Sequence, residues 1–134
     1  MTSEATDHLL PVWLAAQRPR HHFLVRCRRG GFPSVAAEVM SLGTPPVRLC
    51  PLPGPLDLPS DKEGTLLLND VAALGLGDQI ALYDWLGTGA AGLRVISVTA
   101  EPLAALVARG AFLEGLFHRL GAVQLDLTTG EFSS

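Results

Sequence analysis

The segment GTLLLNDVAAL, residues 64–74, decides the fold of this chain. Its three consecutive leucines, Leu66 to Leu68, form an unbroken apolar run, which is typical of a strand covered on both faces of a parallel sheet. The run ends in two polar residues, Asn69 and Asp70. Because ligands of open α/β sheets bind at the carboxyl ends of the strands, this pair indicates a site as well as a fold.

The apolar runs along the chain predict five strands separated by helices. Strands are expected at 21–27, 46–50, 65–69, 93–99 and 122–127, and helices at 9–17, 33–42, 78–87, 100–110 and 112–120. Asp78 and Thr99 are expected to cap the helices that follow them, because their side-chain oxygens can accept from free backbone N–H groups. The alternation predicts an α/β fold with a mostly parallel five-stranded sheet and helices on both faces. A site is expected at the strand ends, residues 27–34, 69–70 and 99–100.

Length and composition indicate one domain. The chain has 134 residues, 48% of them hydrophobic, and a net charge of −3. We divide it into an N-terminal helix and linker (1–20), an α/β core (21–127) and a polar tail (128–134). No run reaches the roughly 18 apolar residues of a membrane span, and the N-terminus lacks the features of a signal peptide, so a cytoplasmic location is expected. The two cysteines lack a C-x-x-C partner, so neither a disulfide nor a metal site is expected.

The second half of the chain resembles a known family. GTLLLNDVAALGLGDQIALYDWL (64–86) and LRVISVTAEPLAALVARGAFLEGLFHRLGAVQLDL (93–127) are similar to the AAA+ central domain of the bacterial enhancer-binding activators of sigma-54 RNA polymerase. The match covers the Walker B strand, the sensor I strand and the F-x-x-x-L-x-x-R-L helix of that family. Upstream, FLVRCRRGGFPSVAAEVM (23–40) can be placed on its strand, P-loop and helix by position. The resemblance implies a P-loop NTPase fold, here without the family's helical lid and with no room in 51–63 for its GAFTGA loop.

The phosphate loop that the resemblance implies is degenerate. A P-loop needs G-x-x-x-x-G-K-[ST], in which glycines expose backbone N–H groups and the lysine neutralises phosphate charge. Cys27 and Phe32 occupy the two glycine positions, and Pro33 occupies that of the lysine. Losing a cation about 4 Å from a phosphate costs about 4 kcal/mol at an effective dielectric near 20, or about three decades of affinity. The degenerate loop positions are Gly30, Gly31, Pro33 and Ser34.

The other nucleotide-handling positions of the family are altered as well. Asn69 and Asp70 stand where Walker B has Asp and Glu, so the charge that holds Mg²⁺ is lost and the base is one methylene shorter. Ala100 replaces the sensor I asparagine. Of the two arginine-finger positions, the first is Leu113 and only the second, Arg119, keeps its arginine. The alternative interpretation of Arg119 is a surface residue at a helix C-terminus, which the helix dipole favours.

Three functions follow from this pattern. The first is a pseudo-ATPase that binds a protein, either an AAA+ activator or a second copy, through Arg119, Phe112 and Phe117, with no cofactor and no metal. The second is a weak ATP-binding protein or ATPase that uses Arg28 or Arg29 in place of the lysine and requires ATP and Mg²⁺. The third is a nucleic-acid binder that uses the basic stretch 18–29, which the acidic net charge disfavours. No membrane partner is expected.

Overall fold

The computed structural model describes residues 22–59, 63–87 and 93–128. The strands are β1 (Phe23–Arg26), β2 (Val47–Pro51), β3 (Gly64–Asn69), β4 (Leu93–Thr99) and β5 (Val123–Asp126). The helices are α3 (Phe32–Leu42), the 3₁₀ turn η1 (Val71–Ala73), α4 (Leu76–Gly87), α5 (Leu103–Ala108) and α6 (Glu114–Leu120). The α/β class predicted from the sequence is confirmed.

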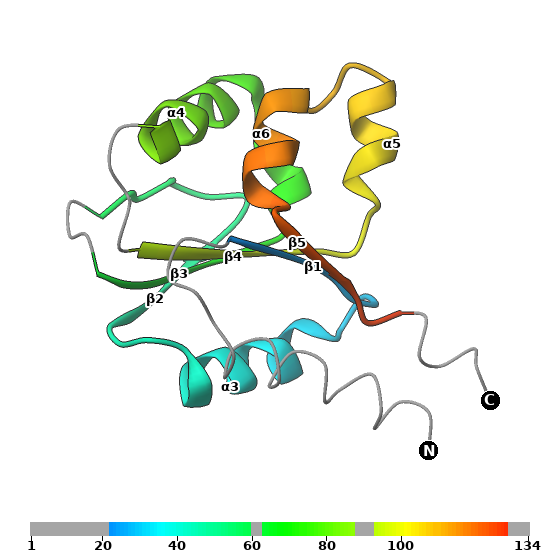
Figure 1. The fold of residues 1–134 in the computed structure, drawn as a ribbon. Coiled ribbons are helices and arrows are strands. Elements are labelled where there is room, and N and C mark those ends of the chain that lie inside the picture. The colour runs from blue at the N-terminus through cyan, green and yellow to red at the C-terminus, as the bar shows by residue number, and fades with distance from the viewer. Residues whose placement is uncertain (1–21, 60–62, 88–92, 129–134) are drawn as a thin grey trace.

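The five strands form one sheet in the order β2-β3-β4-β1-β5, and every neighbouring pair is parallel. Helix α3 lies below the sheet in Figure 1, and α4, α5 and α6 lie above it. Both faces of the central strands are therefore covered. This explains the continuous apolar runs, since all seven residues of β4 and the first five of β3 are buried.

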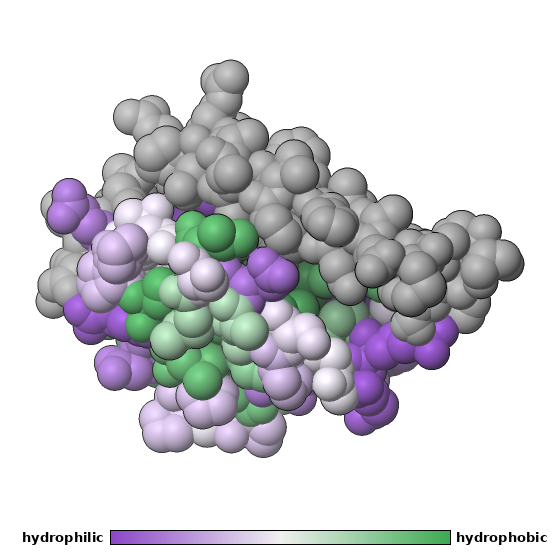
Figure 2. Space-filling view, turned by 90° about the horizontal axis from the view of Figure 1, so that it is seen from below, coloured by the Kyte–Doolittle hydropathy of each residue, from purple (hydrophilic) through white to green (hydrophobic). Residues whose placement is uncertain are grey.

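Two apolar layers hold the helices to the sheet. Below it, Val35 and Val39 of α3 pack with residues such as Leu67 and Ile96. Above it, Leu82 of α4 and two leucines of α6 pack with a larger cluster. The outer side of α3 carries exposed apolar residues, and the view from below shows them gathered among polar ones (Figure 2).

Several element boundaries differ from the sequence prediction. Helix α4 begins at Leu76, so Asp78 lies in its first turn and not at the N-cap. In the first turn its carboxylate still interacts favourably with the helix dipole. The Thr99 hydroxyl bonds to Glu101 instead of capping α5, whose N-cap position is Pro102. The turn η1 was not predicted.

Other sequence predictions fall on residues outside the three described ranges. The N-terminal helix and linker predicted at 1–20 and all but Thr128 of the predicted tail are among them. Within the described ranges, no helix combines the length and apolar character needed to cross a membrane.

Candidate functional site

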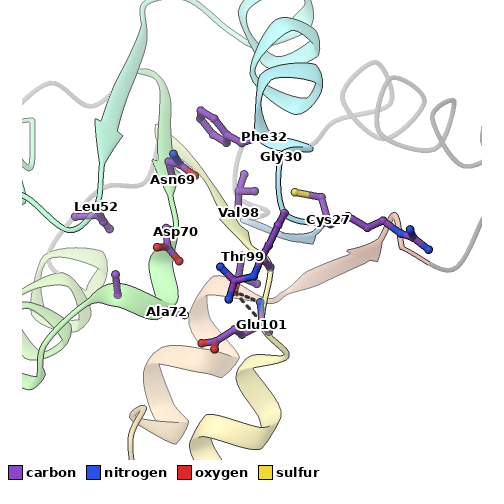
Figure 3. A pocket seen from close by; sticks show the side chains of 14 residues that line it. Cys27, Gly30, Phe32, Leu52, Asn69, Asp70, Ala72, Val98, Thr99 and Glu101 are labelled. Atoms are coloured by element: carbon purple, nitrogen blue, oxygen red, sulfur yellow. Dashed lines mark hydrogen bonds between the residues drawn. The ribbon is translucent and has the colours of Figure 1, made fainter.

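Residues from all three strand ends named from the sequence line one cavity, but Gly31, Pro33 and Ser34 of the predicted loop are not among them. The cavity has a volume of about 490 Å³ and opens at the carboxyl edge of the sheet (Figure 3). The β1–α3 loop contributes Cys27 to Gly30, the end of β3 contributes Asn69 and Asp70, and the end of β4 leads to Ala100. The N–H of Cys27 donates to the Thr99 carbonyl at 3.0 Å, so that the pairing of β1 with β4 continues to the cavity wall. A cavity of this volume fits a small-molecule ligand.

The loop between β1 and α3 turns tightly at the cavity. Gly30 has a φ of 83°, a conformation that glycine adopts without steric cost, and the Gly31 N–H donates to the Arg28 carbonyl at 2.8 Å. Helix α3 then starts with Phe32 and Pro33 and has no side-chain cap. Because proline has no N–H, the first turn of α3, whose Phe32 lines the cavity, has one backbone donor fewer.

Phe32 does not fill the cavity. Its side chain is half-buried and packs against the apolar layer below the sheet. Figure 3 shows the ring at the edge of the cavity, on the side away from Glu101. The space at the carboxyl edge is therefore open, although Phe32 lies beside it.

The charged lining of the cavity is balanced. Arg28 and Arg29 contribute two guanidinium groups, and Asp70 and Glu101 contribute two carboxylates. A triphosphate carries several negative charges and needs an excess of positive ones. In the part of the chain that the structure describes, no three His, Cys, Asp or Glu residues are placed to hold a metal ion. Side-chain charge alone thus gives this cavity no preference for an anion.

Glu101 was not identified from the sequence as a site residue. The Thr99 hydroxyl accepts a hydrogen bond from the Glu101 N–H at 3.0 Å and donates one to the Glu101 carbonyl at 2.8 Å. This local turn brings Glu101 back to the cavity beyond the end of β4. Thr99, two residues before Glu101, could have indicated this turn in the sequence, because threonine side chains often bond to the backbone two residues on.

Asp70 has an unusual backbone conformation. Its φ of 62° and ψ of 55° are left-handed, and it is the one non-glycine residue in the described ranges with a positive φ. Aspartate tolerates this region better than most residues. Its carbonyl accepts from the Ala73 N–H at 2.9 Å and so starts η1, and its carboxylate lies in the cavity (Figure 3). The neighbouring Asn69 carbonyl accepts from the Leu52 N–H at 3.1 Å.

The cavity also contains a thiol. Cys27 is buried, and this burial raises the pKa of its thiol. It therefore stays protonated at neutral pH and is a poor nucleophile. Cys27 and Cys50 are both free cysteines.

The predicted partner-binding residues have three different environments. Arg119 is exposed on α6, but its Nη1 donates to the Tyr83 carbonyl at 3.0 Å and its guanidinium lies over the Tyr83 ring. Phe117 is half-buried and lines a second cavity. Phe112 is only 3% exposed, because the chain turns into the upper apolar layer before α6 begins, so it belongs to the core and not to a contact surface as predicted.

Comparison with solved structures places the fold among P-loop NTPases. The P-loop NTPase domain of a sigma-54 transport activator from E. coli superposes with a TM-score of 0.61 and 13% identity, over 96% of both chains. NtrX from Brucella abortus, in complex with ADP, superposes with a TM-score of 0.71 and 19% identity, over 94% of this chain and 36% of that one. The ATP complex of NtrX gives a TM-score of 0.66. This chain therefore spans about a third of NtrX, and at these identities the likeness shows the fold alone.

The sequence comparisons identify the family. No protein of curated function matches the sequence. The model of the sigma-54 interaction domain family matches residues 45–129, from β2 to beyond β5. This match spans more than half of the 134 residues. The chain therefore belongs to the sigma-54 interaction domain family.

Proposed function

We infer that this chain is a catalytically degenerate sigma-54 interaction module that acts by binding a protein and does not hydrolyse ATP. The observation that carries this proposal is the balanced lining of the carboxyl-edge cavity. Pro33 stands at the start of α3, where the family has a lysine, and Asp70 and Glu101 oppose the two arginines.

The energetic consequence is a large loss of phosphate affinity. A lysine about 4 Å from a phosphate contributes about 4 kcal/mol at an effective dielectric near 20, and proline supplies neither that charge nor an N–H. Asn69 keeps an oxygen but lacks the charge that attracts Mg²⁺. Both changes weaken the binding of the same ligand, Mg-ATP. Together they remove both the binding and the activation of the triphosphate.

The contact surface of the proposed module includes α6. Arg119 and Glu114 are exposed on this helix, and Phe117 is half-buried beside them. The proposed partner is an AAA+ activator of sigma-54 or a second copy of the chain, and the proposed role is regulation of transcription. Membership of the sigma-54 interaction family supports this choice of partner.

Co-purification with a sigma-54 activator tests the binding function. The tagged protein is mixed with the purified AAA+ domain of an activator, and the complex is measured by analytical ultracentrifugation. A complex, or a concentration-dependent dimer of the chain alone, is the expected result. The charge-reversed variant Glu114→Lys should weaken it, and Glu38→Lys on α3, on the opposite side of the sheet, is the matched control. A strictly monomeric chain that binds no activator would refute the proposal.

A second candidate function is weak nucleotide binding, and one observation favours it. The carboxyl-edge cavity is open, and Arg28 and Arg29 both line it. Under this alternative, Mg²⁺-dependent binding of ATP at sub-millimolar concentration is expected, and the double variant Arg28→Gln/Arg29→Gln should abolish it. Binding that survives the double variant would exclude this use of the two arginines.

A further inference from the structure

A second cavity of about 340 Å³ lies above the sheet, between β1, β5 and the helices α5 and α6. Its walls are largely apolar and include Leu103, Phe117 and Leu125. Phe117 comes from α6, the helix of the proposed contact surface. This second cavity is distinct from the strand-end cavity, but the two adjoin, because Thr99 and Glu101 line both.

One carboxylate in the lining of this second cavity has no partner among the described residues. Arg26 supplies one guanidinium, whereas Glu101 and Asp126 supply two carboxylates. Among the described residues, the Glu101 carboxylate makes no hydrogen bond and no ion pair; only its backbone is bonded, to Thr99. Asp126 already interacts with Arg26 and accepts from the Thr128 N–H, so Glu101 is the carboxylate of this lining that is available to receive a cation.

Arg26 provides a second, independent indication of a ligand. Its Nε is buried and has no hydrogen-bond partner in the described ranges. Its Nη1 lies 3.7 Å from Oδ2 of Asp126, which is beyond hydrogen-bond distance. Both side chains stem from paired positions on β1 and β5 and are about 40% exposed. A buried donor without an acceptor is costly, so a rotation of the Arg26 side chain that lets Nε reach a carbonyl oxygen of a ligand would be favoured.

We propose that the second cavity receives a lysine or arginine side chain of a protein partner. The aliphatic stem packs against Phe117 and Leu103, the cation meets the Glu101 carboxylate, and a backbone carbonyl of the same partner segment accepts from Arg26 Nε. Long basic side chains bury their stems against apolar surfaces while their charge stays near solvent, which fits a cavity with apolar walls and acids at its edge. The inference rests on the proposed protein-binding function and names the chemistry of the partner.

An NMR titration with small probes tests this assignment without the partner. Butylguanidinium has the stem and charge of an arginine side chain, butyrate reverses the charge, and methylguanidinium shortens the stem. We expect saturable amide shifts with butylguanidinium at Phe117 and Gln124, which line only the second cavity, and none at Asp70 or Ala72, which line only the first. Butyrate and methylguanidinium should bind at least several-fold more weakly.

Two matched variants complete the experiment. Glu101→Gln keeps the shape and removes the charge, and it should raise the Kd of butylguanidinium about two- to fivefold, as expected for a partly exposed ion pair. Asp70→Asn, which alters only the first cavity, should leave the Kd unchanged. Equal binding of butyrate, or a Kd unaffected by Glu101→Gln, would overturn the proposal. Because no nucleotide and no partner protein is used, failure here is distinct from failure of the protein-binding function.

Discussion

The guanidinium of Arg119 lies 4.0 Å from the ring centroid of Tyr83, and its Nη1 donates to the Tyr83 carbonyl at 3.0 Å. This contact links α6 to the C-terminal half of α4. The last turn of α4 has no basic residue of its own, so Arg119 brings a positive charge close to the C-terminal end of this helix, where the helix dipole favours it. Arg119, which the resemblance aligns with an arginine finger, thus makes an intramolecular contact in this structure.

Replacing Arg119 should therefore destabilise the fold. Arg119→Gln removes the cation–π contact and the charge at the end of α4, and we expect the free energy of unfolding to fall by about 1–2 kcal/mol in urea titrations. Arg109→Gln, at the exposed end of α5, is the matched control and should change it by less than about 0.5 kcal/mol. Equal stability of the two variants would show that the contact with Tyr83 contributes nothing.

Gly87 is predicted to depend on the same contact. A Cβ at this position would lie 2.7 Å from Nη1 of Arg119, so Gly87→Ala should displace the guanidinium and be less favourable than Gly77→Ala. In the Arg119→Gln background the same substitution should cost less, and a double-mutant cycle measures this coupling. Gly77→Ala, where a Cβ meets nothing within 4 Å, is the control and should stabilise α4 by about 0.5–1 kcal/mol. Additive effects of Gly87→Ala and Arg119→Gln would contradict the prediction.

The left-handed conformation of Asp70 makes glycine the favoured substitute. With a φ of 62°, Asp70→Gly should be more stable than Asp70→Ala by about 1 kcal/mol, because alanine has a steric cost in this region that glycine avoids. Thermal unfolding of the two variants gives this difference. An alanine variant as stable as the glycine variant would mean that residue 70 adopts another conformation.

Burial of Cys27 gives a specific dependence on pH. Because burial raises the pKa of this thiol, the unfolded chain ionises first, at its ordinary pKa of about 8.5. Below that pH the thiol therefore has no effect on the free energy of unfolding, and above it the free energy of unfolding falls as the pH rises. Urea titrations between pH 7 and pH 10 should show a steeper loss for the wild type than for Cys27→Ala. Parallel pH profiles would exclude an effect of this thiol.

The sheet could be predicted because its central strands are buried on both faces. Runs such as Leu66 to Leu68 identify such strands without knowledge of their neighbours, and the rule for parallel sheets then places the site at their carboxyl ends. The boundaries of α4 and α6 were less accurate, since their first turns are set by tertiary contacts.

The contacts between distant segments could not be predicted. In the sequence Gln79 is an ordinary polar residue of a predicted helix, yet it is 1% exposed in the structure. Its Nε2 donates to the Leu74 and Ala111 carbonyls and its Oε1 accepts from the Leu113 N–H. This amide joins α4 to the segment before α6, more than 30 residues away in sequence. Periodicity carries no information about such pairs, nor about the burial of Phe112.

The proposed loss of phosphate binding is tested most directly by calorimetric titration of Mg-ATP. The wild type is compared with the double variant Phe32→Gly/Pro33→Lys, which restores the second glycine and the lysine of the loop, and with Phe32→Gly/Pro33→Ala as control. We predict no heat of binding for the wild type or the control at millimolar ATP, and measurable binding only when the lysine is present. Saturable, Mg²⁺-dependent binding of ATP by the wild type below millimolar concentration would contradict this prediction.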